Sequence, residues 1–297
     1  MRIVTNPGSN LDEDLTLALD VDLVPQKIIV DGISRDTRGT IDFAQVDDWV
    51  KKALKHPHVQ GTTEAEFVDY FGNLIKKDPE LLVVMTSRKL IGSHDAAVAA
   101  SKKIAGAKIE VVDSLVTDVG AGLATLAAVQ ARAAGLELAK TAAFVRKFVA
   151  RGRNAFQVAT LDNLIKGGRV GAVQAFVANF LNIRPILSVD DGLVTSVAKT
   201  SAKADPAEKL TEYLTQKMDA KQPVWIAVSH GRAPEVAERV ATRLKEAFPK
   251  HEYALVRPLS PSIYLHLGPG AVTAWVYPLD GLDLRLKAPS PSGRGLG

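Results

Sequence analysis

An α/β fold with two domains is the fold class that the sequence predicts, and two observations carry the prediction. In the first half, short apolar runs alternate with stretches of helical periodicity, which is typical of a parallel sheet covered by helices. In the second half, Asp190-Asp191-Gly192 separates two strand-like runs and is a strong hairpin signal. Because a hairpin joins antiparallel strands, the second half is predicted to contain a mixed sheet.

The first domain is expected to cover residues 1–153. Residues 31–38 and 56–61 are expected to be loops, and Thr63 with Glu66 has the spacing of a capping box. Its predicted strands span 2–5, 27–30, 81–85 and 108–112, and its predicted helices span 12–19, 43–55, 64–77, 120–134 and 138–151, with one more beginning near Ser93.

The second domain is expected to cover residues 154–280. Residues 281–297 are rich in Pro, Ser and Gly and are predicted to be a disordered tail. The predicted strands of this domain span 156–160, 185–189, 193–199, 224–229, 253–257 and 271–277, and its predicted helices span 161–165, 172–181, 206–218 and 234–248.

The first domain is organised around the stretch from Leu81 to Ala105. A buried strand ends in a polar loop, and an alanine-rich helix follows, for which Ser93 is predicted to be the N-cap. Ligands bind at loops that follow strand C-termini, and helix N-termini offer free N–H groups to anions. A plain strand-to-helix connection with a capping serine explains the same residues.

Composition excludes several classes of protein. The chain of 297 residues has no cysteine, so disulfides, thiolate metal sites and cysteine catalysis are excluded. The net charge is +4, but the basic residues are dispersed and form no stripe typical of a nucleic-acid binder. We expect no signal peptide and no transmembrane helix, and therefore a cytoplasmic protein.

Nucleotide-binding and hydrolase motifs are also missing. Gly120-Ala121-Gly122 resembles part of a dinucleotide fingerprint, but Thr125 occupies the third glycine position. We interpret these glycines as sites of close helix packing. The sequence contains neither a phosphate-loop pattern nor a GxSxG nucleophile elbow.

Six short motifs, in the same order along the chain, resemble those of the DegV family of bacterial fatty-acid-binding proteins. Gly61-Thr62-Thr63 stands where the family has Thr-Ser-Gln-Pro, and residues 86–93 stand where it has Ser-Ser-x-Leu-Ser-Gly-Thr. The other four are residues 112–114 with Gly120 and Gly122, residues 161–164 with 166–169, residues 230–232, and residues 266–270, where the family has His-Thr-Gly-Pro-Gly.

The resemblance implies a DegV-like fold with a parallel, Rossmann-like first domain and a mixed-sheet second domain. It further implies a long-chain fatty acid held in a tunnel between the domains, with no cofactor and no catalysis. On the matching positions, the carboxylate-binding residues would be Thr62, Thr63, Ser93 and His266. Candidate tunnel residues by position are Phe176, Phe180, Ile183 and Ile263, for each of which ordinary core packing is the alternative.

Some members of the family act as the acyl-carrier subunit of a fatty acid kinase. Arg169 and Lys199 are the candidates for contact with such a partner, and Arg169 could equally be a helix C-terminal charge.

Two other functions compete with lipid binding. A hydrolase would pair Ser93 with His266, with Asp113 as the residue that orients the histidine. A sugar or nucleotide binder at the edge of the first sheet would lack its usual glycine fingerprint.

Overall fold

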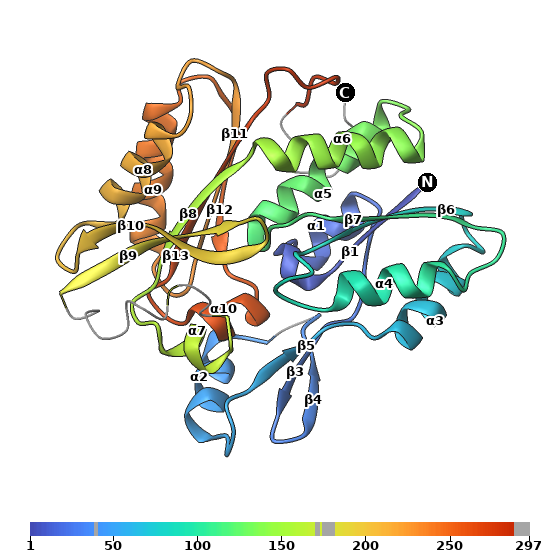
Figure 1. The fold of residues 1–297 in the computed structure, drawn as a ribbon, viewed down its shortest axis with the longest axis horizontal. Helices are drawn as coiled ribbons and strands as arrows, with labels where there is room; N and C mark the ends of the chain where they lie inside the picture. Colours follow the sequence, from blue (N-terminus) through green and yellow to red (C-terminus); the bar gives the residue numbers. More distant parts are fainter. Residues whose placement is uncertain (39–40, 170–172, 174–181, 288–297) are drawn as a thin grey trace.

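The computed structural model describes residues 1–38, 41–169, 173 and 182–287, and they form five layers (Figure 1). Two sheets lie on either side of a central pair of helices, and a further pair of helices covers the outer face of each sheet. The predicted α/β class and the division into a parallel and a mixed sheet are confirmed.

The first sheet has four parallel strands in the order β2-β1-β6-β7. The central strand β6 is apolar because both of its faces are covered, as the run Leu81–Met85 predicted. Phe67 and Phe71 of α3 pack on its outer face. The elements are β1 (Arg2–Thr5), β2 (Val21–Leu23), β6 (Glu80–Met85), β7 (Lys108–Asp113), α3 (Glu64–Leu74) and α4 (Ser93–Ser101).

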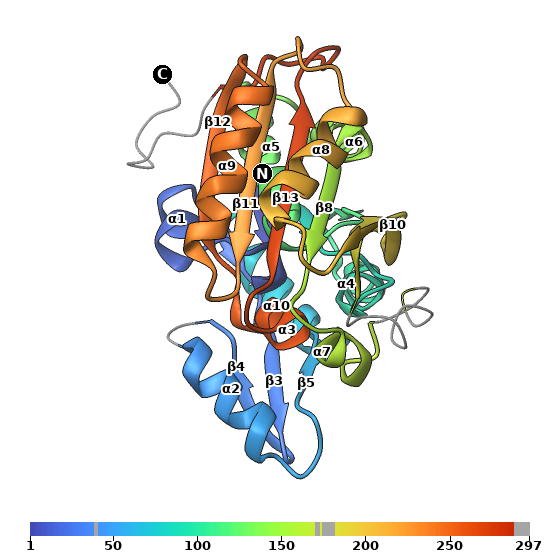
Figure 2. The ribbon, with the colours of Figure 1, turned by 90° about the vertical axis from the view of Figure 1, so that its left-hand side faces the viewer.

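The second sheet has six strands in the order β10-β9-β8-β13-β11-β12. Only β11 and β12 pair in parallel within it, and the β9–β10 hairpin turns at Asp191-Gly192 as predicted. Figure 2 shows α8 and α9 on its outer face. The elements are β8 (Arg153–Gln157), β9 (Ile183–Asp190), β10 (Leu193–Ser201), β11 (Val224–His230), β12 (His251–Pro258), β13 (Val272–Pro278), α8 (Pro206–Gln216) and α9 (Pro234–Ala247).

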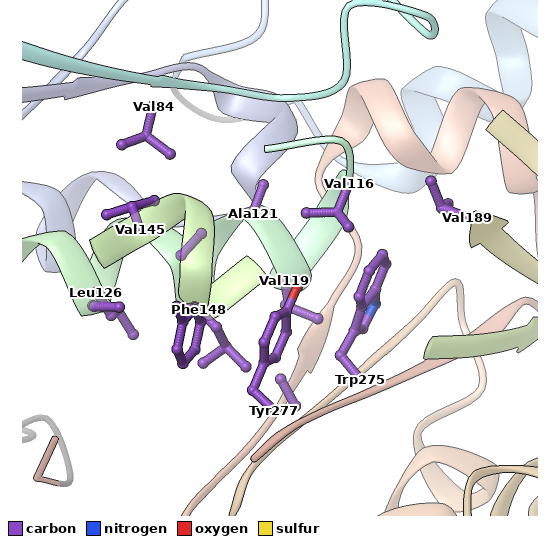
Figure 3. Packing of buried hydrophobic residues seen from close by; sticks show 14 of the residues in the cluster. Val84, Val116, Val119, Ala121, Leu126, Val145, Phe148, Val189, Trp275 and Tyr277 are labelled. Atoms are coloured by element: carbon purple, nitrogen blue, oxygen red, sulfur yellow. The ribbon is translucent and has the colours of Figure 1, made fainter. Parts of the chain in front are cut away.

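Helices α5 (Asp118–Ala133) and α6 (Leu138–Arg151) fill the space between the two sheets. Phe148 of α6 stacks on Tyr277 of β13 with ring centroids 4.5 Å apart (Figure 3). A Cβ added at Gly120 would lie 2.3 Å from the Trp275 ring, so only glycine lets α5 approach β13 this closely. The interpretation of Gly120 as a packing glycine is therefore confirmed.

A third, smaller sheet with the order β4-β3-β5 projects below the two large ones beside α2 (Figure 1). The prediction of loops at 31–38 and 56–61 was wrong, because β4 and β5 lie there. All four residues of β4 are exposed, so this strand lacks the apolar alternation that would reveal it. The elements are β3 (Lys27–Val30), β4 (Ile33–Asp36), β5 (His58–Gln60) and α2 (Phe43–Lys52).

Four short elements complete the described fold: η1 (Pro7–Ser9), α1 (Glu13–Ala18), α7 (Asp162–Lys166) and α10 (Pro261–Leu267). Helix α10, like strand β2, was not predicted, since both are brief.

The helix predicted over 172–181 lies outside the described residues except for Val173. Within the segment predicted to be a disordered tail, Leu286 is buried in the central core, and the side chain of Gln130 on α5 hydrogen-bonds with the backbone of Lys287. Residues 288–297 lie outside the description. No helix in the described ranges is long and apolar enough to cross a bilayer.

Candidate functional site

A cavity lies where the two large sheets, the small sheet and the short helices α7 and α10 meet. The volume in it that is open to the centre of a water-sized sphere is about 70 Å³. That is below the usual range for small-molecule sites, so lining side chains must move before a larger ligand fits. The apolar part of its wall consists of Val59, Leu90, Ile91, Phe156, Leu164, Val189, Val194, Ile263, Leu267 and Trp275.

The positions of the lining residues follow from the topology. Thr86 and Leu90 follow the C-terminal end of β6, the edge of a parallel sheet where ligands bind. Val189 and Val194 flank the hairpin turn of the second sheet. The cavity is therefore bounded by both halves of the chain, and neither half encloses it alone.

His266 lines the cavity from α10, whose last turn it occupies. Its Nδ1 is buried and has no hydrogen-bond partner among the described residues, while the side chain as a whole is half-buried. Burial, reinforced by the positive charges of Arg169 and His56, lowers the pKa of His266 to about 3. The imidazole is therefore neutral at pH 7 and can donate one hydrogen bond and accept one.

Arg169 follows α7 and also lines the cavity. Its guanidinium donates to the backbone carbonyls of Gly167 and Leu90, and it forms no ion pair with any acidic residue that the structure describes. Burial lowers the pKa of Arg169 below its usual range, and the group still carries its charge at pH 7. A half-buried cation without a carboxylate partner is suited to an anionic ligand.

Ser93 does not cap its helix, contrary to the prediction. Gly92 holds the N-cap position, and Ser93 is the first helical residue of α4. Its Oγ is buried without a partner among the described residues. A Cβ added at Gly61 would lie 2.2 Å from this oxygen, so the hydroxyl faces the backbone of Gly61 directly.

Thr62 and Thr63 have protein partners for their hydroxyls. Thr62 is buried and donates to the carbonyl of Pro25. Thr63 is exposed and caps α3 in the predicted box with Glu66. Neither threonine nor Ser93 lines the cavity. Ile91 does line it, and its side chain packs on Gly61 beside Ser93.

Of the other site residues predicted from the sequence, one lines the cavity, two do not, and two lie outside the described residues. Ile263 lines the cavity from α10. Ile183 begins β9 and is not among the lining residues, and Phe176 and Phe180 lie outside the described residues. Lys199 lies exposed on β10 and is not among the lining residues.

Asp118 is an acidic residue in the wall of the same cavity. It begins α5 with φ of 57° and is buried. Its Oδ1 accepts from Asn10 at 2.9 Å, and its Oδ2 accepts from the hydroxyls of Ser229 and Thr273. All of these donors are neutral, so the negative charge of Asp118 disfavours a carboxylate at this part of the wall.

The structure does not assemble a hydrolase triad. Asp113 accepts hydrogen bonds from the backbone of Arg88 and Leu115, not from His266. Ser93 Oγ and His266 Nδ1 each lack any hydrogen-bond partner among the described residues. The described residues also contain no cluster of three or more His, Cys, Asp or Glu side chains that could hold a metal.

Sequence reasoning missed Gln26, Asp118 and Trp275 as lining residues. Gln26 stands in an unremarkable link between two short strands, and Asp118 has the pattern of an ordinary first-turn acid. Nothing in the spacing of these residues shows that they meet at one cavity, since that follows from how the sheets pack.

Known proteins resemble this chain over most of its length. A family model described as "Uncharacterised protein, DegV family" matches residues 1–279. A DegV domain-containing protein of Mycobacterium tuberculosis is 31% identical over 272 residues, which are 91% of this chain and 94% of that protein.

Solved structures share the fold. A DegV family protein of Thermus thermophilus, described as fatty acid binding, aligns with a TM-score of 0.87 and 24% identity over 94% of this chain and 100% of that one. A DegV family protein of Eubacterium eligens loaded with heptadecanoic acid aligns with a TM-score of 0.80 and 20% identity, over 94% of this chain and 99% of that one.

Proposed function

This chain belongs to the DegV family, and we propose that it binds a long-chain fatty acid in the cavity between its two halves. The observation that carries the proposal is the composition of the cavity wall. Most of the wall is apolar, and it also holds Arg169, which has no acidic partner among the described residues, and His266, whose Nδ1 has no hydrogen-bond partner there. That composition fits an apolar ligand with an anionic end.

The charges of the wall set the orientation of the ligand. The carboxylate lies toward Arg169 and His266, because Asp118 would repel it. The acyl chain then runs along Phe156, Val189 and Trp275. Each buried CH₂ contributes about 0.8 kcal/mol, so a chain of about ten buried carbons supplies most of the affinity and the head group supplies the orientation.

Ser93 and Thr62 complete the head-group region in this proposal. Ser93 Oγ lies beside the lining residue Ile91 and lacks a partner among the described residues. The Ser93 hydroxyl reaches the carboxylate of the ligand if the Ile91 side chain moves aside. Thr62 supports the backbone at Pro25, and Thr63 serves chiefly to cap α3.

A kinase partner would meet the protein at a different surface. Lys199 is exposed on β10, where another protein can contact it, whereas Arg169 donates to Gly167 and Leu90 at the cavity. We therefore assign the partner contact to Lys199 and the ligand charge to Arg169. Transfer of phosphate from ATP to the bound acid by an added fatty acid kinase, reduced in Lys199→Glu, tests the partnership.

Mass spectrometry of lipid extracted from the purified protein tests the main proposal. We expect about one fatty acid per chain, and rebinding of palmitate or oleate after lipid removal. Ser93→Ala should weaken that binding about tenfold without loss of stability, because a charged hydrogen bond is lost and no protein bond is broken. Ser101→Ala, at the other end of α4, is the matched control. Protein that carries no lipid and binds neither acid would overturn the proposal.

A further inference from the structure

Gln26 is a buried polar residue of the cavity wall, and its side-chain oxygen is unpaired within the described chain. Its side chain lines the cavity, and the residue is only 3% exposed. Its Oε1 has no hydrogen-bond partner among the described residues. Burying an amide without a hydrogen bond costs about 1–3 kcal/mol, so a side chain held this way is suited to a ligand.

The strand register places Gln26 beside the head-group region. Strands β3 and β5 are antiparallel with Lys27 opposite Gln60, so the next position along puts Gln26 opposite Gly61. Thr62 donates to the carbonyl of Pro25, which agrees with that placement. Residues that face each other across antiparallel strands share one face of the sheet.

That shared face is the one that meets Ser93. A Cβ at Gly61 would point at Ser93 Oγ, and Val59, two residues earlier on β5, lines the cavity from the same face. Gln26 and Ser93 therefore both adjoin Gly61 on this face of the small sheet. Both carry a polar side-chain atom that is buried and unpartnered within the described chain.

We propose that Gln26 is a head-group ligand that donates its side-chain N–H to the carboxylate of the bound acid. The proposal rests on the fatty-acid binding proposed above. The orientation of a glutamine amide is set by its partners, so the nitrogen can point to the cavity when a carboxylate is present. Gln26 would then select for a carboxylate, because an N–H bond to a charged acceptor is stronger than a bond to a neutral one.

Binding of palmitate and of hexadecanol to the lipid-free full-length protein tests this role. Gln26→Met keeps the length of the side chain and removes the amide. We expect palmitate affinity to fall about tenfold or more and hexadecanol affinity to fall by less, since only the acid loses a charged hydrogen bond. The carboxyl ¹³C resonance of bound [1-¹³C]palmitate should also shift in Gln26→Met.

Gln157→Met is the matched control. Gln157 is likewise buried, but its amide donates to Thr200 and it does not line the cavity. It should change neither affinity nor the carboxyl resonance. Unchanged palmitate affinity in Gln26→Met, or equal losses for acid and alcohol, would overturn the role of Gln26. If the wild-type protein binds no fatty acid, the function itself fails instead.

Discussion

The hydroxyl of Ser87 donates a hydrogen bond of 2.8 Å to the carbonyl oxygen of Gly192, 105 residues further along the chain. Beside it, Lys89 forms an ion pair of 2.6 Å with Asp191. Ser87 and Lys89 belong to the loop after β6, and Asp191-Gly192 is the tip of the β9–β10 hairpin. The two contacts join the halves of the molecule at elements that both contribute to the cavity wall.

Loss of the Ser87 hydrogen bond should let bound fatty acid escape faster. In Ser87→Ala we expect the dissociation rate to rise roughly three- to tenfold. That factor corresponds to the free energy of one neutral hydrogen bond, here the bond that holds the hairpin against the loop after β6. Transfer of a fluorescent fatty acid to albumin, followed by stopped flow, measures that rate. Thr195→Ala is the control, since the Thr195 hydroxyl donates to the carbonyl of Ser188 within the hairpin itself. A rate equal to that of the wild type would show that the hairpin does not close the site.

The hairpin shows what could be predicted from the sequence and what could not. The Asp-Gly turn and its flanking strands were predicted because local backbone chemistry specifies them. Their contact with Ser87 was not, because it depends on how two sheets pack around α5 and α6.

The same contrast holds at the site. His266 was predicted to belong to the head-group region through a family motif, while its place on a helix was missed because α10 has only seven residues. Serine is a frequent N-cap residue, so Ser93 was predicted to be the N-cap of its helix, whereas Gly92 holds that position. Gln26 has no local signal at all, because its role depends on strand pairing between distant residues.

A side chain at Gly61 should displace its neighbours. In Gly61→Ala the new Cβ would lie 2.2 Å from Ser93 Oγ and 3.1 Å from Ile91, so both must move. We expect a loss of about 1–3 kcal/mol in the free energy of unfolding and at least tenfold weaker fatty-acid binding. Urea unfolding and palmitate titration measure the two effects.

Gly72 provides the matched substitution for Gly61. It lies within α3, and a Cβ there would meet no atom within 4 Å. Gly72→Ala should therefore stabilise the protein by about 0.5–1 kcal/mol through helix propensity and leave binding unchanged. Equal behaviour of the two alanine variants would contradict the tight packing at Gly61.

Asp118→Asn should destabilise the contact between α5 and the second sheet. The carboxylate accepts hydrogen bonds from Ser229, Thr273 and Asn10. In the variant, an NH₂ group replaces one carboxylate oxygen, so at least one of these buried donors loses its acceptor. Asparagine tolerates the φ of 57°, so backbone strain adds little. We expect a loss of about 1–3 kcal/mol in urea unfolding. A double-mutant cycle with Ser229→Ala should show coupling, and additive losses would argue against the shared acceptor.

Stability should fall in mild acid because of His266. Its pKa is about 3 in the folded protein, well below the ordinary value of 6.5, so below pH 6.5 the unfolded chain binds a proton that the folded protein excludes. The free energy of unfolding attributable to this group therefore decreases as pH falls from 6.5 toward 3, by up to ~1.4 kcal/mol per pH unit.

His266→Gln should remove this part of the pH dependence, and His58→Gln, at an exposed position on β5, should leave it in place. Urea unfolding at pH 7 and pH 5 gives the difference for each variant. A carboxylate bound beside His266 favours the imidazolium and raises its pKa, so saturation with palmitate should flatten the dependence in the wild-type protein. A slope that is the same with and without palmitate would place the carboxylate away from His266.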